Sequence, residues 1–377
     1  MAEAVKEQAA GLRNVVAGQS AVCTIDGARG VLSYRGIDIH ELAEHSTFEE
    51  TVYLLHRGGL PTRPQLQAFR AELARARAVP DEVYGILRGL PRSAHPMDAL
   101  RTGLSALGSF DPDAGDDGEE ARPRKAVRLV AQTATLVAAI DRIRGGRIPV
   151  SPDAQLGHAA NFLYMLGGER PRPSAERAMD VALILHADHE FNASTFTARV
   201  AASTLADLHG AVTAAVCTLK GPLHGGANEA VMQMLERIGA VERTEGWITE
   251  ALAARRKVMG FGHAVYRTED PRATHLRRLA RQMGEEARDT RWFEMTSRVE
   301  ALVREAKGLY ANVDLYSASL YHVMGIPTDL FTPIFAVSRM AGWTAHALEQ
   351  AANNKLIRPE SEYIGPRDVR YVPLDER

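Results

Sequence analysis

The spacing of apolar residues along the chain is mostly that of α-helices. Leu66, Phe69 and Leu73 line one face of a segment that opens at Thr62, and they recur at intervals of three and four. Residues 126–142 and 175–189 are denser in apolar side chains, rich in Ala and poor in β-branched runs, which is typical of buried helices. Residues 199–219 continue this pattern. The sequence therefore predicts a mainly α protein.

Local signals set the limits of these elements. Thr47 to Glu50 resembles a capping box at a helix start, and the glycines at 58 and 59 indicate its end. Residues 23–34 alternate weakly around Asp26-Gly27, which predicts a short N-terminal β-hairpin. Residues 110–125 mix acidic side chains with Gly and Pro, as in a solvated loop between helices, and the tail from Leu356 is expected to be extended.

Size and charge narrow the class of protein. With 377 residues and 45% apolar content, the chain can bury a large core and exceeds the usual size of one compact domain, so two lobes are expected. A net charge of −2 gives no basic field that would favour nucleic acid or an anionic membrane as partner. Cys23 and Cys217 stand too far apart to indicate a disulfide framework, and residues 1–12 lack the apolar core of a secretory signal. No apolar run is long enough to cross a bilayer, and a cytoplasmic protein is expected.

The most informative feature is His224, which lies in the glycine-rich run at residues 221–230 just before a segment of helical periodicity. The apolar positions of that segment are Ala227, Ala230, Val231, Met234, Leu235 and Ile238. A helix should start near Gly226, and its N-terminal dipole would disfavour a charged imidazole at His224. A neutral histidine there can donate a hydrogen bond to a carbonyl, which suits enolate formation. The alternative is a capping or packing histidine.

A second glycine-flanked histidine, His263, precedes Arg267 and Arg272. The glycines let backbone amides approach a ligand, Arg272 can hold a carboxylate with its planar guanidinium, and Arg267 could meet a phosphate. A surface loop with solvated arginines is the alternative, because a lone Gly-x-Gly is weak evidence for any one cofactor.

A third cluster places Asp314 just before an expected helix, where it could act as a base or simply cap the helix. Further on, Arg339 stands on an otherwise apolar helix, where an unpaired charge is costly to bury. Arg339 therefore requires an anionic partner. That partner could be a structural Asp or Glu, or the carboxylate of a substrate.

Taken together and in this order, the three clusters resemble the citrate synthase family, and the resemblance covers almost the whole chain. Further segments resemble the family at residues 34–36, 95–97, 189–194 and 356–359. The resemblance implies a two-domain helical fold that closes over its substrates in a symmetric homodimer. The large domain would comprise residues 1–224 and 326–377, with dimerisation and the oxaloacetate site, and the small domain residues 225–325, with the coenzyme A site.

The resemblance also implies roles for individual residues. Asp314 would take a proton from the methyl group of acetyl-CoA, His224 would stabilise the enolate, and His263 would protonate the oxaloacetate carbonyl, giving citryl-CoA and, after hydrolysis, citrate. The expected substrate-binding residues are His189, Arg272, Phe335, Arg339 and Arg358, the last reaching into the other subunit's site. The expected coenzyme A contacts are Val258, Met259, Gly260, Phe261, Arg267 and Lys307. No metal and no cofactor are expected, since the coenzyme A thioester is a substrate.

Three other interpretations stay open. A 2-methylcitrate synthase, using propionyl-CoA, differs by one methyl group in the acyl pocket, worth only about 1–3 kcal/mol, and dual use of both thioesters is possible. The run His186-Ala187-Asp188-His189-Glu190 is the basis for a metallohydrolase, although its spacing matches no zinc motif. A purely structural helical scaffold would leave the histidine turns and Arg339 without a common explanation. The chain lacks the N-terminal extension that accompanies NADH-regulated hexameric members of the family, so a simple dimer is expected.

Overall fold

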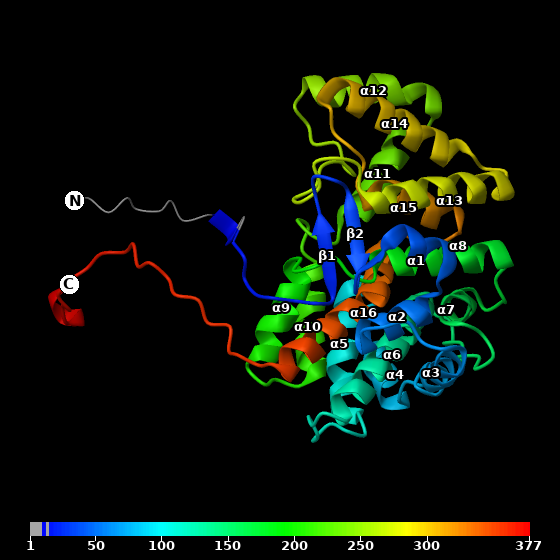
Figure 1. Ribbon diagram of the computed structural model, residues 1–377. Coiled ribbons are helices and arrows are strands. Elements are labelled where there is room, and N and C mark those ends of the chain that lie inside the picture. Colours follow the sequence, from blue (N-terminus) through cyan, green and yellow to red (C-terminus); the bar gives the residue numbers. More distant parts are fainter. Residues whose placement is uncertain (1–9, 13–14) are drawn as a thin grey trace.

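The computed structural model describes residues 10–12 and 15–377, and it is mainly helical, as the sequence predicts (Figure 1). One set of helices forms the larger body: α1 (Ile39–His45), α2 (Phe48–Arg57), α3 (Arg63–Arg75), α4 (Asp81–Arg88), α5 (Pro96–Phe110), α6 (Ala121–Arg144), α7 (His158–Gly167), α8 (Pro173–His186), α9 (Ala193–Ser203), α10 (Leu208–Leu219) and α16 (Phe331–Ala352). A second set follows α10: α11 (Ala227–Ile238), α12 (Thr244–Ala253), α13 (Pro271–Ala287), α14 (Arg291–Lys307) and α15 (Val313–Val323). The sequence predicts no secretory signal in residues 1–12. Residues 1–9 of this segment lie outside the described residues.

The second set of helices packs mainly within itself. Helix α15 contacts α11, α13 and α14, and α12 contacts α14. In Figure 1 this group lies above the larger body. The two sets also meet, because α13 contacts α1 and α8, and α11 contacts α16. The division into domains at residues 225 and 325 stays a prediction.

The predicted hairpin is confirmed. Strands β1 (Cys23–Asp26) and β2 (Val31–Tyr34) pair antiparallel, with Cys23 opposite Tyr34. A third strand, β3 (Ile37–Asp38), adds to β2 and is too short to leave a pattern in the sequence. At the tip of the hairpin, the carbonyl oxygen of Gly27 accepts a hydrogen bond of 2.8 Å from the backbone amide of Arg267. The hairpin thereby supports the loop that carries His263.

Helix limits follow the local signals closely. Thr47 caps α2 by accepting from the amide of Glu50, and Gly58 ends that helix in the left-handed region, with φ 83°. Thr62 caps α3. The predicted solvated loop is shorter than expected, because α6 begins at Ala121 and the loop is left with residues 111–120. Within that loop, Asp111 is buried and accepts two hydrogen bonds from Arg128, which the acidic composition alone did not indicate.

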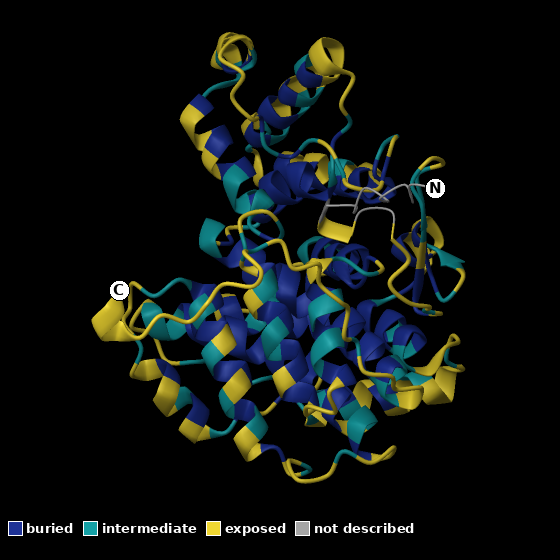
Figure 2. Ribbon diagram, turned by 90° about the vertical axis from the view of Figure 1, so that its left-hand side faces the viewer, coloured by how far each residue is buried: buried dark blue, intermediate teal, exposed yellow. Residues whose placement is uncertain are grey.

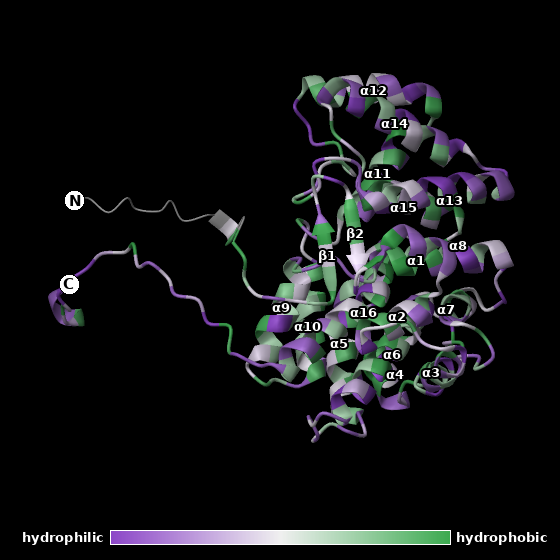
Figure 3. Ribbon diagram, viewed as in Figure 1, coloured by the Kyte–Doolittle hydropathy of each residue, from purple (hydrophilic) through white to green (hydrophobic). Residues whose placement is uncertain are grey.

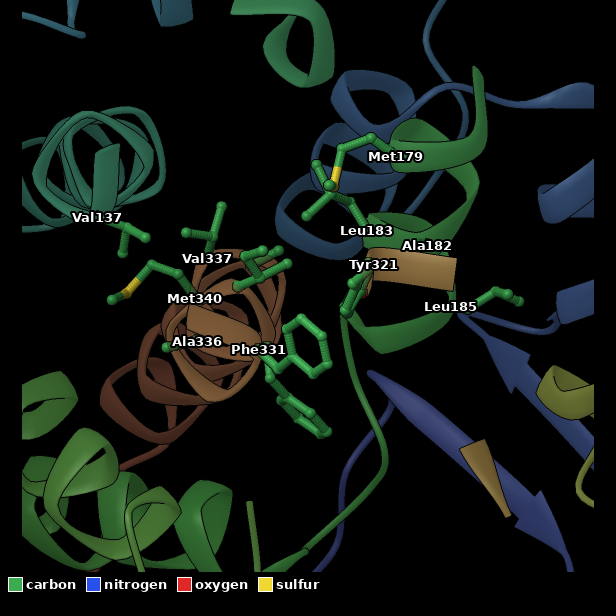
Figure 4. Packing of buried hydrophobic residues seen from close by; sticks show 14 of the residues in the cluster. Val137, Met179, Ala182, Leu183, Leu185, Tyr321, Phe331, Ala336, Val337 and Met340 are labelled. Atoms are coloured by element: carbon green, nitrogen blue, oxygen red, sulfur yellow. The ribbon is translucent and has the colours of Figure 1, made fainter. Parts of the chain in front are cut away.

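The core of the larger body is built around α16, which is buried along most of its length. Figure 2 shows buried residues gathered in the interior of this body, with exposed residues on its outer helices and loops. Helix α16 contacts α2, α6, α8, α9 and α10. Its apolar side chains point to several sides: Phe331 lies on the side of Leu183, whereas Met340 lies beside Val137 of α6 (Figure 4). Hydrophobic positions gather on these inner helices, whereas α13 shows a run of hydrophilic ones (Figure 3). Along the described part of the chain, no helix combines the length and apolar character needed to span a membrane.

The tail is extended, as expected. After α16 the chain leaves the helices, and Figure 1 shows the C-terminus well away from them. Apolar side chains of this segment are exposed, including Leu356, Ile364 and Tyr371. Exposed apolar side chains on an extended arm suit contact with another chain.

Candidate active site

His224 lies in the turn between α10 and α11, and α11 begins at Ala227, next to the predicted start. Burial and, after it, the charge of Arg339 lower the pKa of His224 to about 4. The imidazole is therefore neutral at physiological pH, as the sequence predicted. Burial is the main cause, whereas the sequence argument had invoked the helix dipole.

Ser194 anchors the His224 ring and was not assigned a role from the sequence. Its Oγ lies 2.8 Å from Nε2 of His224. The same oxygen accepts a hydrogen bond from Nε1 of Trp343 at 3.1 Å and lies 2.8 Å from Oδ1 of Asn192. The backbone amide of Ser194 donates to Nε2 of His224 at 3.3 Å, so the proton of the neutral ring is on Nδ1, which is left to donate to a ligand. Ser194 is fully buried in the first turn of α9. The contact with Trp343 spans 149 residues and the contact with His224 spans 30, and no local pattern could indicate either of them.

His263 is oriented by its own loop. Its Nδ1 accepts hydrogen bonds from the backbone amides of Val265, at 3.0 Å, and Tyr266, at 3.2 Å. Because an amide can only donate, Nδ1 carries no proton, and in the neutral ring the proton resides on Nε2. Burial and the charge of Arg272 lower the pKa of His263 to about 4. The ring is thus a neutral donor through Nε2.

Asp314 does not cap its helix. The cap of α15 is Asn312, whose Oδ1 accepts from the amide of Asp314 at 3.0 Å, and Asp314 lies one residue inside the helix. Its carboxyl is 8% exposed, and Oδ1 has no hydrogen-bond partner among the described residues. Burial raises the pKa of Asp314 to about 7, in spite of the opposing charge of Arg272. A carboxyl group with this pKa can exchange a proton near neutral pH.

Arg272 is held by Asp270, a partner that the sequence analysis missed. Asp270 caps α13, and its two carboxylate oxygens accept from Nε and from one terminal nitrogen of Arg272, at 2.9 and 2.6 Å. Asp-Pro-Arg is a recognisable signal, since an aspartate followed by proline favours a helix start. Nε and one terminal nitrogen of Arg272 are therefore occupied by Asp270, and a ligand would bind the other terminal nitrogen.

Arg339, in contrast, has no carboxylate oxygen within 4.0 Å in the part of the chain that the structure describes. It is 1% exposed, donates from Nε to the carbonyl oxygen of His186 at 2.7 Å, and lies 4.7 Å above the ring of Phe335. The sequence predicted an anionic partner for Arg339, and no carboxylate of the described residues lies within this distance. A carboxylate ligand would fill that place.

His189 follows α8 and faces the other site residues. Its Nε2 lies 3.2 Å from the hydroxyl of Tyr266, and its ring centroid lies 5.0 Å from that of His263. Tyr266, like Ser194 and Asp270, was not assigned a role from the sequence. Burial, followed by the charge of Arg272, lowers the pKa of His189, so this ring is also neutral.

Two buried guanidinium groups connect these side chains electrostatically. The charge of Arg339 acts on the pKa of His224, His189 and Asp314. The charge of Arg272 acts on His189, His263 and Asp314. Since such effects fall with distance, the shared influence of the two cations indicates that the three predicted catalytic residues lie in one region. This region can bind a dianion beside a base and two neutral donors.

The turn at residues 258–261, which is expected to contact coenzyme A, is attached to the start of α15. Phe261 forms a β-bridge with Ala311, and the carbonyl oxygen of Gly260 accepts from the amide of Asn312 at 3.0 Å. Gly260 has φ 86°, and a Cβ there would lie 2.8 Å from the side chain of Leu315, so glycine is required. Val258 and Met259 lead into this turn. A ligand bound along the turn would therefore lie close to the helix of Asp314.

Three of the predicted binding residues are exposed, and their side chains make no hydrogen bond or ion pair with the buried site residues described above. The side chains of Arg267 and Lys307 are exposed, at the site loop and at the end of α14 respectively. Arg358 is exposed in the extended C-terminal segment. Nothing in the structure contradicts a role in binding phosphates or a second subunit, and these roles stay predictions.

The run that motivated a metallohydrolase does not converge on one point. Nδ1 of His186 bonds the carbonyl oxygen of Ala182, Asp188 pairs with His346, and His189 faces Tyr266. Within residues 10–12 and 15–377, no group of three or more His, Cys, Asp or Glu side chains is arranged to hold a metal ion. A cavity of about 640 Å³ lies elsewhere, against α2, α3, α7 and α8, and none of the predicted site residues lines it.

Comparison with known proteins agrees with this geometry. The family model described as citrate synthase, C-terminal domain, matches residues 11–360. Citrate synthase 2 of Bacillus subtilis is 50% identical over 97% of this chain and 98% of its own length. A 2-methylcitrate synthase of Shewanella oneidensis is 42% identical over 100% of both chains. The solved ternary complex of carboxymethyl coenzyme A and oxaloacetate with citrate synthase from Thermoplasma acidophilum superposes with a TM-score of 0.91, at 31% identity, covering 97% of this chain and 98% of that one. The chain belongs to the citrate synthase family of enzymes.

Proposed function

We propose that this protein condenses acetyl-CoA with oxaloacetate and water to give citrate and CoA, and that Asp314, His224 and His263 carry the chemistry. The observation that carries this proposal is the buried carboxyl of Asp314, with a pKa of about 7, in one region with two neutral histidines. The reaction requires a base that is ionised at neutral pH and donors that do not bring a charge of their own.

In the first step Asp314 removes a proton from the methyl group of the thioester. Because that methyl is weakly acidic, the negative charge that develops on the thioester oxygen must be stabilised as the proton leaves. His224 donates a hydrogen bond to this oxygen. A positioned base is worth about 10²–10⁴-fold, and one oxyanion donor about 10²–10³-fold.

In the second step the enolate carbon attacks the carbonyl carbon of oxaloacetate. As Nε2 of His263 passes its proton to the carbonyl oxygen, which becomes the hydroxyl of citryl-CoA, water returns a proton to Nε2, so that the ring stays neutral. Water then cleaves the thioester, and CoA leaves as the thiol. Hydrolysis of the thioester makes the overall synthesis effectively irreversible. The steps use side chains and water alone, so the proposal includes no metal and no cofactor.

The substrates are held by the buried cations and by the glycine-rich turn. Arg339, Arg272 and His189 would bind the oxaloacetate carboxylates, with Phe335 lining the pocket. The open guanidinium of Arg339 supports this, since a buried cation without a carboxylate partner favours an anionic ligand. Residues 258–261, Arg267 and Lys307 would bind CoA. The solved relative that holds a CoA analogue and oxaloacetate supports the same pair of ligands here.

The proposal extends to assembly and setting. The protein would act as a homodimer in the cytoplasm, in the entry step of the tricarboxylic acid cycle. The extended C-terminal arm, with its exposed apolar side chains, supports a second copy of the chain as partner. Arg358, on that arm, would then reach the site of the other subunit.

Thiol release tests the reaction directly. Purified protein is mixed with oxaloacetate and either acetyl-CoA or propionyl-CoA, with and without a chelator. We expect release with acetyl-CoA, faster than with propionyl-CoA and unaffected by the chelator. Asp314→Asn is the matched control, and it should release thiol at least about 10²-fold more slowly.

The full-length similarity to a 2-methylcitrate synthase makes propionyl-CoA the alternative substrate. Faster release with propionyl-CoA would assign that function instead. If neither thioester is consumed, the proposed reaction is wrong.

A further inference from the structure

Three residues on one face of α16 make hydrogen bonds to residues 186–188, the segment that leads to His189. Nε of Arg339 donates to the carbonyl oxygen of His186 at 2.7 Å. The amide of Gly342 donates to the carbonyl oxygen of Ala187 at 3.0 Å. One turn further, Nε2 of His346 lies 3.2 Å from Oδ2 of Asp188. Three positions spaced along one helix face thus bind three consecutive residues.

The approach at the middle position is so close that only glycine fits. A Cβ at residue 342 would overlap the carbonyl oxygen of Ala187 and the carboxylate of Asp188. The helix and the segment therefore have little freedom to shift relative to each other. The side-chain pair of His346 and Asp188 lies directly beyond this contact.

The direction of the hydrogen bond between His346 and Asp188 follows from a third residue. Arg199 of α9 lies 3.1 Å from Nδ1 of His346, and an arginine can only donate. Nδ1 must therefore accept, so the proton of the neutral ring is on Nε2 and is donated to Asp188. Arg199 is in turn held by Glu349 at 2.6 Å. The chain of contacts thus fixes the tautomer of His346.

Asp188 is fully buried and remains ionised. Burial acts to raise its pKa, whereas the hydrogen bond from His346 and the charge of Arg339 lower it, and the pKa of Asp188 lies below its usual value. Burial lowers the pKa of Arg339 to about 10, and Asp188 is the acid that opposes this most strongly. The carboxylate of Asp188 therefore stabilises the charged form of Arg339, and Asp188 directly precedes His189 in the chain.

We infer that Asp188 and His346 are positioning residues for oxaloacetate: their hydrogen bond holds residues 186–188 against α16 so that His189 and Arg339 present a fixed binding surface. Neither residue touches the substrate. The inference rests on the proposed function, and it adds to it two residues that lie behind the binding surface.

The test separates the hydrogen bond from packing and from stability. His346→Leu removes the donor to Asp188, whereas His346→Gln keeps an N–H that can reach Asp188 and an oxygen that can accept from Arg199. We expect the oxaloacetate Kd, measured by titration calorimetry, to rise at least about tenfold in His346→Leu and to return to within about threefold in His346→Gln. The KM for acetyl-CoA at saturating oxaloacetate should change less than about twofold.

A matched control uses the other buried histidine that faces an aspartate. His209 of α10 is 3% exposed, its Nε2 lies 3.7 Å from Oδ2 of Asp111, and it has no part in the proposed site. His209→Leu should leave the oxaloacetate Kd unchanged. The inference is overturned if folded His346→Leu binds oxaloacetate normally, if His346→Gln is as impaired as His346→Leu, or if His209→Leu weakens binding equally.

Binding and turnover are read separately. Unmutated protein that binds oxaloacetate but releases no thiol would overturn the proposed reaction, and the calorimetric comparison would still decide the role of His346. Unmutated protein that does not bind oxaloacetate would overturn both.

Discussion

The raised pKa of Asp314 predicts that the residue proposed as the base destabilises the folded protein at neutral pH. In the unfolded chain this carboxyl has the ordinary aspartate pKa of 3.8, and in the folded protein burial raises the pKa to about 7. The difference is about three pH units, and each unit corresponds to about 1.4 kcal/mol. Ionised Asp314 therefore costs the folded state about 4 kcal/mol at pH values above both pKa values.

The sign of the pH dependence follows from proton binding. Between pH 3.8 and about 7 the folded protein keeps the proton on Asp314 while the unfolded chain releases it. Unfolding thus becomes more favourable as pH rises through this range, and the full cost is reached only above pH 7. Asp314→Asn removes the titration. The free energy of unfolding of the variant, relative to the unmutated protein, should increase by about 2–3 kcal/mol from pH 5 to pH 8.

Urea denaturation at a fixed protein concentration, repeated across this pH range, measures the difference. A constant offset from the new amide would not matter, since only the change with pH is used. Asp375→Asn, in the exposed C-terminal segment, is the control for the same substitution away from the site. If Asp314→Asn gives a constant difference, then the pKa of Asp314 is not raised, and the assignment of this residue as a base poised near neutrality fails.

Three further outcomes are expected. The kcat/KM for acetyl-CoA should rise with pH to a plateau above about pH 7 as Asp314 ionises, with no titration of His224 or His263 above pH 5, because their pKa values are about 4; a flat profile between pH 5 and 8 would contradict this. His224→Ala should lower kcat by about 10²–10³-fold while the calorimetric Kd for oxaloacetate stays within a few-fold, and an unchanged kcat would remove His224 from the mechanism. Gly260→Ala should destabilise the protein by about 2–4 kcal/mol and weaken CoA binding, because it adds both a strained φ and a contact with Leu315. Gly36→Ala is its control, with φ 84° and no atom within 4 Å of the added Cβ; equal losses in urea denaturation would mean that the contact with Leu315 contributes nothing.

Much of the fold was predictable from the sequence because its signals are local. Apolar residues at intervals of three and four indicated the buried helices, and Thr62, Gly58 and the hairpin at Asp26-Gly27 marked where elements begin and end. Such signals depend on a few neighbouring residues whose backbone conformations are restricted in the same way in any fold. Strand β3 and the start of α6 were missed, since two residues carry no period and a charged first turn resembles a loop.

The candidate site was predictable as a set of residue types, but not as an arrangement. The sequence indicated His224, His263, Asp314 and Arg339, and it left open whether Asp314 was a base or a cap. Only the tertiary structure showed that Asn312 is the cap and that Asp314 is buried with one oxygen unpaired; the role of Asp314 as a base stays a proposal. The pKa of a side chain depends on the whole of its surroundings, most of which come from distant parts of the chain.

The residues behind the site depend entirely on the tertiary structure. Ser194 beside His224 and Asp270 beside Arg272 fix the orientation of side chains that the sequence had singled out. His346 donates to Asp188 across 158 residues, with its tautomer set by Arg199. The sequence by itself therefore determined the helices, the hairpin and the chemical groups available. Packing around α16 decided which groups meet, which stay neutral and which carry charge, because burial and hydrogen bonding act through space rather than along the chain.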